Sequence, residues 1–205
     1  MDSNYDNAAW FYDRLSRVAF GRSLLRAQSY FLPLIPAGAK MLIAGGGTGM
    51  ILEEIARIHP AGLQITYAEV SANMIRLARK RRFGHNQVMY LNTAVEHVTD
   101  TEGFDVLITP FLLDSIPPEV FAQIFDRLGS LLKPGGLWLN TDFKLTGKWW
   151  QPLLLQNMYL FFRLTGCTAN KQLPPISQAF YAGGFSLQAE KAFYGSFIIA
   201  EAYKK

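Results

Sequence analysis

The sequence predicts an α/β fold, namely a doubly wound, seven-stranded, mostly parallel sheet with an antiparallel C-terminal hairpin. Three observations lead to this prediction. Short apolar strands alternate with amphipathic helices from about residue 41 to 142, which is typical of a parallel sheet covered by helices on both faces. Segments 185–191 and 196–203 instead read as two strands joined by a short turn. Half of the 205 residues are hydrophobic and 18% are charged, so the chain can form a packed core.

The predicted elements follow one another without internal repeats or a polar linker. Expected strands lie at 41–44, 64–68, 87–91, 104–109 and 136–142, and expected helices at 50–58, 72–82 and 118–132. The last of these helices is the best defined, because its apolar residues recur at spacings of three and four. Pro117 and Pro118 stand where this helix begins, and Pro134 and Gly135 follow its end.

The composition argues against some functional classes. A net charge of +4 is only mildly basic for a chain of 205 residues, below what a dedicated nucleic-acid-binding protein usually carries. The basic run 79–82, joined by Arg76, is expected to be a solvated helix end, so nucleic acid is not an expected partner. The single Cys167 cannot form an internal disulfide and the N-terminus lacks a signal-peptide pattern, so a cytoplasmic location is expected. The three histidines are scattered, so no metal is expected.

The most informative segment is 41–49, a short apolar strand that runs into a glycine-rich loop. Its glycines Gly45, Gly47 and Gly49 stand at alternate positions, G-x-G-x-G. The dinucleotide fingerprint G-x-G-x-x-G would need a glycine in place of Met50, and the Gly-Lys-Ser/Thr ending of a Walker loop is absent. Glycines let the chain turn sharply and let a ligand approach bare backbone, and the following helix points its N-terminal amides at the turn.

Glu69 is predicted to stand just after the second strand, twenty residues beyond the loop. In open parallel sheets, ligands bind outside the carboxyl ends of the strands. A carboxylate in that place can accept hydrogen bonds from two ribose hydroxyls. The glycine loop and the acid together therefore predict a site for a nucleoside that carries no pyrophosphate. The alternative is an ordinary strand-to-helix turn with a surface glutamate.

These residues resemble the class I S-adenosylmethionine-dependent methyltransferases. The similar segments, in the order of that family's motifs, are 42–49, 67–74, 104–111, 132–136 and 183–185. They correspond to the first glycine motif, the second strand with its acid, the fourth strand, a Leu-Lys-Pro-Gly-Gly turn and a Gly-Gly-Phe before the terminal hairpin. Tyr5, Tyr12 and 20–22 add a looser similarity to the quinone-biosynthesis C-methyltransferase branch.

The resemblance implies a Rossmann-like methyltransferase fold with strand order 3-2-1-4-5-7-6 and S-adenosylmethionine as the cofactor. The glycine loop would pass the methionine part of the cofactor, the acid would hold the ribose, and residues after strands two and three would pack on the adenine and line its edge. Tyr5 or Tyr12 would close over the methionine end or pack with other aromatic residues. The expected cofactor-binding residues are Gly45, Gly46, Gly47, Gly49, Glu69, Val70, Met74, Thr93, Ala94 and Tyr12.

Two positions depart from the family's pattern. The family usually has an acid two residues before the first glycine, where this chain has Ile43, and an acid after strand three, where the nearest residue is Thr93. A lost charge-assisted hydrogen bond costs about 1.5–3 kcal/mol, so cofactor binding would be weaker. A second hypothesis is therefore a catalytically degenerate methyltransferase-fold protein that acts as an interaction or assembly partner. A third, an NAD-type reductase, is disfavoured by Met50.

No catalytic residue is assigned from the sequence. Methyl transfer needs the donor and acceptor held in line, and a base is required only where the acceptor is a hydroxyl or a carbon acid. Candidates for such a base, at strand ends or on the N-terminal segment, are Asp114, Asp142, Tyr12 and His97. Each has a structural alternative, which is a cap or a turn for the aspartates and packing or surface exposure for the other two.

We expect one compact domain with two additions, namely an N-terminal helical cap at 1–40 and an apolar insert at 146–175 within a methyltransferase domain at 41–205. The apolar stretch 149–165 is shorter than the roughly 20 residues that cross a bilayer. Four interpretations are open for this stretch: a helix buried against the sheet or cap, a lid over an apolar acceptor, a dimer interface, or a face that contacts a membrane. We favour the lid. The expected partner is therefore a small apolar or aromatic acceptor, with homodimerisation and peripheral membrane contact left open.

Overall fold

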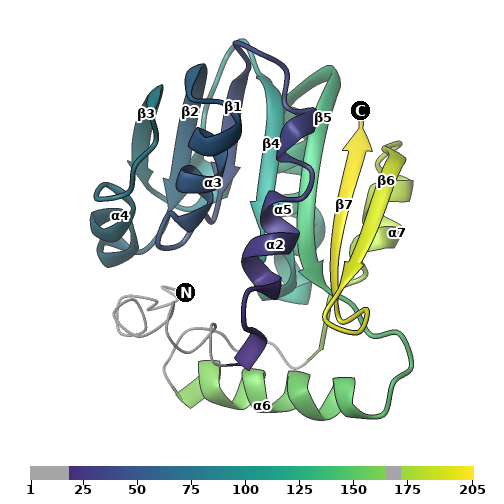
Figure 1. Cartoon of the computed structure of the whole chain (residues 1–205). Helices are drawn as coiled ribbons and strands as arrows, with labels where there is room; N and C mark the ends of the chain where they lie inside the picture. The colour runs from purple at the N-terminus through teal and green to yellow at the C-terminus, as the bar shows by residue number, and fades with distance from the viewer. Residues whose placement is uncertain (1–18, 165–171) are drawn as a thin grey trace.

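The computed structural model describes residues 19–164 and 172–205, with the backbone alone for 161–164, so the predictions for Tyr5, Tyr12 and Cys167 concern residues outside the described ones. One seven-stranded sheet of order β3-β2-β1-β4-β5-β7-β6 carries helices on both faces (Figure 1). Strands β1 to β5 are parallel to one another, whereas β7 runs antiparallel to both β5 and β6. The predicted fold class, strand order and C-terminal hairpin are confirmed.

The strands are β1 Lys40–Ala44, β2 Ala61–Glu69, β3 His85–Asn92, β4 Phe104–Pro110, β5 Leu132–Phe143, β6 Ser186–Phe193 and β7 Ile198–Lys204. The helices are α2 Ser23–Ser29, α3 Met50–Ile58, α4 Ala72–Ala78, α5 Pro118–Leu131, α6 Trp150–Leu164 and α7 Ile176–Ala182. Short 3₁₀ helices are η2 Leu32–Leu34, η3 Val95–His97 and η4 Leu113–Ser115. The predictions for β1, α3, β3, β4 and α5 agree with these bounds closely, because each is an apolar pattern bounded by glycine, proline or polar residues.

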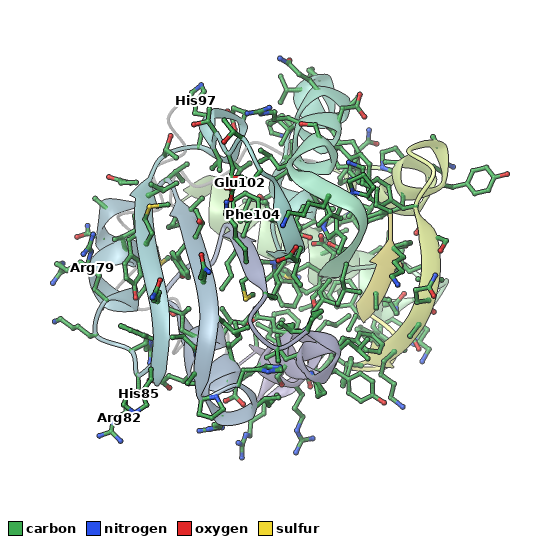
Figure 2. All side chains as sticks on the ribbon, turned by 90° about the horizontal axis from the view of Figure 1, so that it is seen from above. Arg79, Arg82, His85, His97, Glu102 and Phe104 are labelled. Atoms are coloured by element: carbon green, nitrogen blue, oxygen red, sulfur yellow. The ribbon has the colours of Figure 1, made fainter. Side chains whose placement is uncertain are left out.

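Helix α4 is shorter than predicted, since it ends at Ala78 and not at residue 82. The N–H groups of Lys80 and Arg81 each donate to the carbonyl three residues earlier, at 3.0 Å, so the chain tightens and leaves the α-helical path. The basic run is therefore a turn that follows the helix. Its exposed members Arg79 and Arg82 lie at the outer edge of the molecule (Figure 2).

Strand β5 begins at Leu132, four residues earlier than predicted. Leu132 pairs with Phe104, and beyond an irregularity the register continues with Leu137 beside Val106. Gly135, with a φ of +73°, lies within this irregular stretch. The Leu-Lys-Pro-Gly-Gly segment is therefore the bulged first part of the strand rather than a turn before it, because β4 holds the chain on both sides of the bulge.

Apolar clusters cover both faces of the sheet. One face packs on α5 and α7 around the fully buried Trp138, and the other packs on α3 and η2 around the fully buried Tyr67. A third cluster joins α2 and α6 to the end of β5 and the β6–β7 hairpin, and its buried members are Phe20, Ala27, Phe143, Leu155, Phe197, Ile198 and Ala200. Burying one such side chain contributes about 1.5–3 kcal/mol, so this cluster fixes α6 against the sheet.

Helix α6 lies along the edge of the sheet at which the parallel strands end (Figure 1). Leu155 on this helix is buried in the third cluster, whereas Trp149, just before the helix, is 84% exposed. The apolar stretch of the sequence is thus a helix that packs on the strand ends with one side. In the described part of the chain, no helix is long and apolar enough to cross a membrane.

Candidate functional site

The glycine loop connects β1 to α3 at the carboxyl edge of the sheet. Gly45, Gly47 and Gly49 have φ angles of +69°, +61° and +79°, a region that glycine enters without steric cost. The glycines of the loop differ in how much room a side chain would have. A Cβ on Gly46 would overlap the ring of Tyr67, whereas a Cβ on Gly47 would meet no heavy atom within 4 Å. Gly46 therefore lets the loop pack on the sheet, and Gly47 presents bare backbone to open space.

Gly49→Ala is expected to destabilise the protein by about 1–3 kcal/mol more than Gly38→Ala. Both glycines have a positive φ, of +79° and +73°, so the backbone strain is shared. A Cβ on Gly49 would stand 2.7 Å from the Cβ of Ala78 and 2.8 Å from its Cα, whereas Gly38 has open space. Urea unfolding of the two variants measures the difference, and equal losses would mean that α4 moves aside without cost.

Glu69 is the last residue of β2 and is only 7% exposed. One of its carboxylate oxygens accepts the N–H of Gly47 at 3.0 Å, and the other accepts the N–H of Ser71 at 3.0 Å. Ser71 in turn caps α4, because its hydroxyl accepts the N–H of Met74 at 3.1 Å. A carboxylate has about four lone-pair sites, so its oxygens can accept O–H donors in addition to these N–H groups. The structure thus joins the loop and the acid that the sequence predicted to act together.

Two residues that the sequence analysis missed hold the loop in place. Tyr67 lies beside Ile43 in the β1–β2 register and donates its hydroxyl to the carbonyl of Gly47 at 2.8 Å. Arg81 donates its Nε–H to the carbonyl of Thr48 at 3.0 Å. Ile43, the first departure from the family's pattern, is fully buried, and the neighbouring tyrosine supplies a polar contact to the loop. The sequence does indicate that Tyr67 lies on the same face of the strand as Glu69, because it precedes this acid by two residues.

The residues predicted to surround the adenine lie at the ends of β2 and β3. Val70 is exposed, and Asn92 donates an Nδ2–H to its carbonyl at 2.7 Å, which ties the two strand ends together. Thr93 and Ala94 follow β3 directly and are half-buried. Met74 is buried, so its side chain forms part of the packing beneath this surface. Val70 follows Glu69 directly, and Asn92, which precedes Thr93, pairs with Glu69 in the β2–β3 register.

Of the four candidates for a base, the structure brings two together. Asp114 on η4 and Asp142 near the end of β5 are both buried, and each changes the ionisation of the other. Burial raises the pKa of Asp114 to about 6. Burial, together with the adjacent Asp114 carboxylate, raises the pKa of Asp142 well above its usual range. His97 on η3 is exposed at the periphery (Figure 2), and Tyr12 lies outside the described residues.

Buried polar groups extend from the interior of the sheet toward this pair. Trp138 donates its Nε1–H to the hydroxyl of Thr109 at 2.9 Å, and this hydroxyl donates to Oδ1 of Asn140 at 2.9 Å. Asn140 donates from Nδ2 to Glu201 at 3.1 Å. Asn140, Asp142 and Glu201 line a pocket of about 280 Å³. Its apolar wall includes Phe143, Leu145, Leu173, Pro174, Ile176 and Ile199. Among the described residues, no three His, Cys, Asp or Glu side chains are placed to hold a metal ion.

The fold and the site can now be compared with those of known proteins. A G-x-G-x-G loop after β1, bound by an acid at the end of β2 within a sheet of this strand order, resembles the arrangement of the class I S-adenosylmethionine-dependent methyltransferases. Residues 42–138 match the family described as a methyltransferase domain. Residues 42–138 of this chain are therefore similar to a methyltransferase domain, in agreement with the resemblance described from the sequence.

Similar proteins agree with this assignment. The ubiquinone biosynthesis O-methyltransferase of Xanthomonas axonopodis pv. citri is 30% identical over 139 residues, which cover 66% of this chain and 56% of that protein. The chain spans about half the length of the curated relatives it matches first. The 1,6-didemethyltoxoflavin-N1-methyltransferase of Burkholderia thailandensis, with 1,6-didemethyltoxoflavin and S-adenosylhomocysteine bound, has a TM-score of 0.65 at 15% identity, covering 97% of this chain and 88% of that one. The magnesium protoporphyrin IX methyltransferase of Synechocystis PCC 6803, with S-adenosylhomocysteine bound, has a TM-score of 0.67 at 14% identity, covering 98% and 96%.

Proposed function

We propose that this protein is an S-adenosylmethionine-dependent methyltransferase that acts on a small apolar or aromatic acceptor. The contact between Glu69 and the N–H of Gly47 carries the proposal, because it sets a carboxylate that could accept ribose hydroxyls beside backbone with open space over it. Ribose hydroxyls would donate to Glu69 while the methionine part passes along the loop from Gly45 to Gly49. The bound cofactor supplies the methyl group, and these residues hold it in position.

Similar structures support the choice of cofactor, since two of them hold S-adenosylhomocysteine. The adenine would rest against Val70 and Met74, with Thr93 and Ala94 at its edge. Tyr12, outside the described residues, is proposed to close over the methionine end. Because Thr93 offers a hydroxyl where the family usually has an acid, we expect a weaker contact with the adenine than a carboxylate would give.

The acceptor side of the proposal is supported by aromatic rings at the strand ends. Phe111 follows β4 directly, and its ring centroid lies 5.0 Å from that of Phe143, which in turn lies 5.0 Å from Phe197. Phe111 has a φ of +55°, a strained conformation for a residue with a side chain, and such strain is concentrated at functional sites. Rings of this kind favour an apolar or aromatic acceptor over a charged sugar.

The predicted division of the chain completes the proposal. We propose that 1–40 caps the methyltransferase domain at 41–205, and that the insert at 146–175 is a lid over the acceptor. The position of α6 along the strand ends supports the lid, because an acceptor must reach the methyl group from that edge (Figure 1). The proposed setting is cytoplasmic.

Calorimetric titration with S-adenosylhomocysteine is the direct test of the cofactor site, with NAD as the matched control. We expect micromolar binding of S-adenosylhomocysteine, equivalent to about −8 kcal/mol, and no binding of NAD. The glycine loop lacks the third glycine at position 50 that a pyrophosphate would need. Binding of NAD alone would overturn the proposal in favour of a reductase.

A catalytically degenerate interaction partner is the second candidate function, and two observations favour it. Ile43 offers no hydrogen bond where the family has an acid, and the helix α6 region has exposed apolar side chains at Trp149, Leu153 and Leu160. These three positions share one side of a helix and would form the interface in a homodimer or at a membrane surface. Absence of S-adenosylhomocysteine binding, together with a stable dimer in sedimentation, would favour this function.

A further inference from the structure

Asp142 is a buried carboxyl group that the cofactor site does not use. It is 4% exposed, and it lies against the side chain and backbone of Asp114, but neither of its oxygens has a hydrogen-bond donor of normal geometry among the residues that the structure describes. An unsatisfied buried polar group costs about 1–3 kcal/mol. The same side chain lines the pocket of about 280 Å³. A buried carboxyl group that lacks a well-placed hydrogen-bond donor and faces a pocket points to a ligand that supplies this donor.

The pair of Asp142 and Asp114 lies next to the glycine loop. Leu112 packs on that loop, since a Cβ on Gly45 would stand 2.9 Å from its Cδ1, and Asp114 follows two residues later. The N–H of Phe111 donates to the carbonyl of Thr141 at 2.7 Å, immediately before Asp142 in β5. The exit of β4 thus places the carboxyl pair beside the loop that is proposed to carry the methyl donor.

Other ionisable groups face the pair from the neighbouring elements. Tyr159 on α6 has a buried hydroxyl without a partner among the described residues, and burial with the two carboxylates raises its pKa. It therefore remains an O–H donor. On β7, burial raises the pKa of Glu201, while Lys144 opposes that shift. Lys144 also lines the pocket, and its Nζ pairs with Glu190 at 3.1 Å.

These surroundings fit a hydroxyl group better than an ammonium group. Burial raises the pKa of both carboxyl groups, that of Asp114 to about 6 and that of Asp142 well above its usual range, so the buried pair favours the uptake of a proton. Such a pair can accept a hydrogen bond through one carboxyl group and donate one through the other, which a hydroxyl oxygen can match. A site for an ammonium group would instead keep its carboxylates ionised.

We propose that Asp114 and Asp142 share one proton and together bind the hydroxyl group of an aromatic methyl acceptor and take up its proton. This inference rests on the proposed function and narrows its acceptor to a hydroxyl compound. The acceptor's O–H bond breaks, its proton joins a carboxylate oxygen of the pair, and the electron pair stays on the acceptor oxygen. That oxygen then bonds to the methyl carbon supplied by the cofactor, and the sulfur keeps the electron pair of the broken bond. The Tyr159 hydroxyl, whose ionisation both carboxylates influence, would donate to the acceptor oxygen.

The test is an NMR-detected titration of the protein, saturated with S-adenosylhomocysteine, with 4-methylphenol and separately with benzylamine. We expect 4-methylphenol to bind, and its affinity to fall as pH decreases through about 6, where the pair gains its second proton. Asp142→Asn should weaken this binding at least tenfold and remove the pH dependence, with less than a twofold change for S-adenosylhomocysteine. With S-adenosylmethionine in place of the product, mass spectrometry should detect 4-methylanisole from the wild-type protein.

Asp126→Asn on α5 is the matched control, because it removes an exposed carboxylate far along the helix from the pair, and it should change none of these values. No binding of 4-methylphenol, or equal binding by the wild type and Asp142→Asn, would overturn the inference. Tighter binding of benzylamine would show a cation site instead, and binding without 4-methylanisole would refute the proton-acceptor role. If the wild-type protein does not bind S-adenosylhomocysteine at all, this separate result contradicts the proposed function itself.

Discussion

Glu69→Ala is expected to weaken the binding of S-adenosylhomocysteine at least tenfold. The carboxylate of Glu69 would accept two ribose hydroxyls, and it already holds the N–H groups of Gly47 and Ser71 at 3.0 Å each. A tenfold change corresponds to about 1.4 kcal/mol, which is less than the 1.5–3 kcal/mol of a single charge-assisted hydrogen bond. The substitution removes both the direct contacts and the support of the loop, so tenfold is the lower bound.

Isothermal calorimetry measures this loss, and two variants bracket it. Glu69→Gln keeps the size of the side chain and one acceptor oxygen but removes the charge, so we expect an intermediate affinity. Glu96→Ala removes an exposed carboxylate on the nearby η3 and should leave the affinity unchanged. If Glu69→Ala binds S-adenosylhomocysteine as tightly as the wild type does, the assignment of the ribose to this residue is wrong.

The parts of the fold that the sequence predicted are those set by local patterns. Helix α3 and strand β4 were placed closely because each apolar run is bounded by residues that start or stop it. Helix α4 was extended too far because arginine and lysine are good helix formers, whereas its end is decided by tertiary contacts. Arg81 contacts the carbonyl of Thr48 and Arg79 lies over the ring of Tyr90, and neither neighbour is close in sequence.

The candidate site also has features that follow from the sequence and features that only the structure shows. The pairing of the glycine loop with Glu69 followed from their spacing, since adjacent parallel strands bring their carboxyl ends together. The spacing of Tyr67 from Glu69 indicates that the two share a face of β2, whereas the partner of its hydroxyl, the carbonyl of Gly47, depends on the packing of the loop. The sequence marks Asp114 and Asp142 as separate candidates for a base and does not indicate that they pair. Their pairing arises because β4 and β5 are neighbours and η4 turns the chain back over the end of β5.

Asp142→Asn is expected to raise the free energy of unfolding at neutral pH by about 1–3 kcal/mol, although we place this residue in the acceptor site. The wild-type carboxyl pair is buried, and both pKa values are raised because the interior disfavours their charge. The introduced amide carries no charge and can donate a hydrogen bond to the carboxylate of Asp114. A gain in stability with a loss of acceptor binding is the usual relation at a functional site.

The pH dependence follows from the direction of these shifts. In the unfolded chain both carboxyl groups lose their protons near pH 3.8, whereas in the folded protein the pKa of Asp114 is raised to about 6 and that of Asp142 well above its usual range. Over this range the folded state holds more protons, so the free energy of unfolding falls as pH rises. The contribution of the pair is fully present below pH 3.8 and is lost as pH rises through the raised values. Asp142→Asn should therefore stabilise most at neutral pH and least in acid.

Urea unfolding at about pH 7.5 and again near pH 4 measures both expectations, and the gain should shrink between the two conditions. In thermal unfolding, each 1 kcal/mol corresponds to a shift in Tm of about 2–4 °C for a chain of this size. Asp126→Asn, which removes an exposed carboxylate, should stay within about 0.5 kcal/mol of the wild type at either pH. Lower stability of Asp142→Asn at neutral pH, or an equal gain at both pH values, would mean that the pair stabilises the fold, and its unpartnered oxygens would then no longer indicate a ligand.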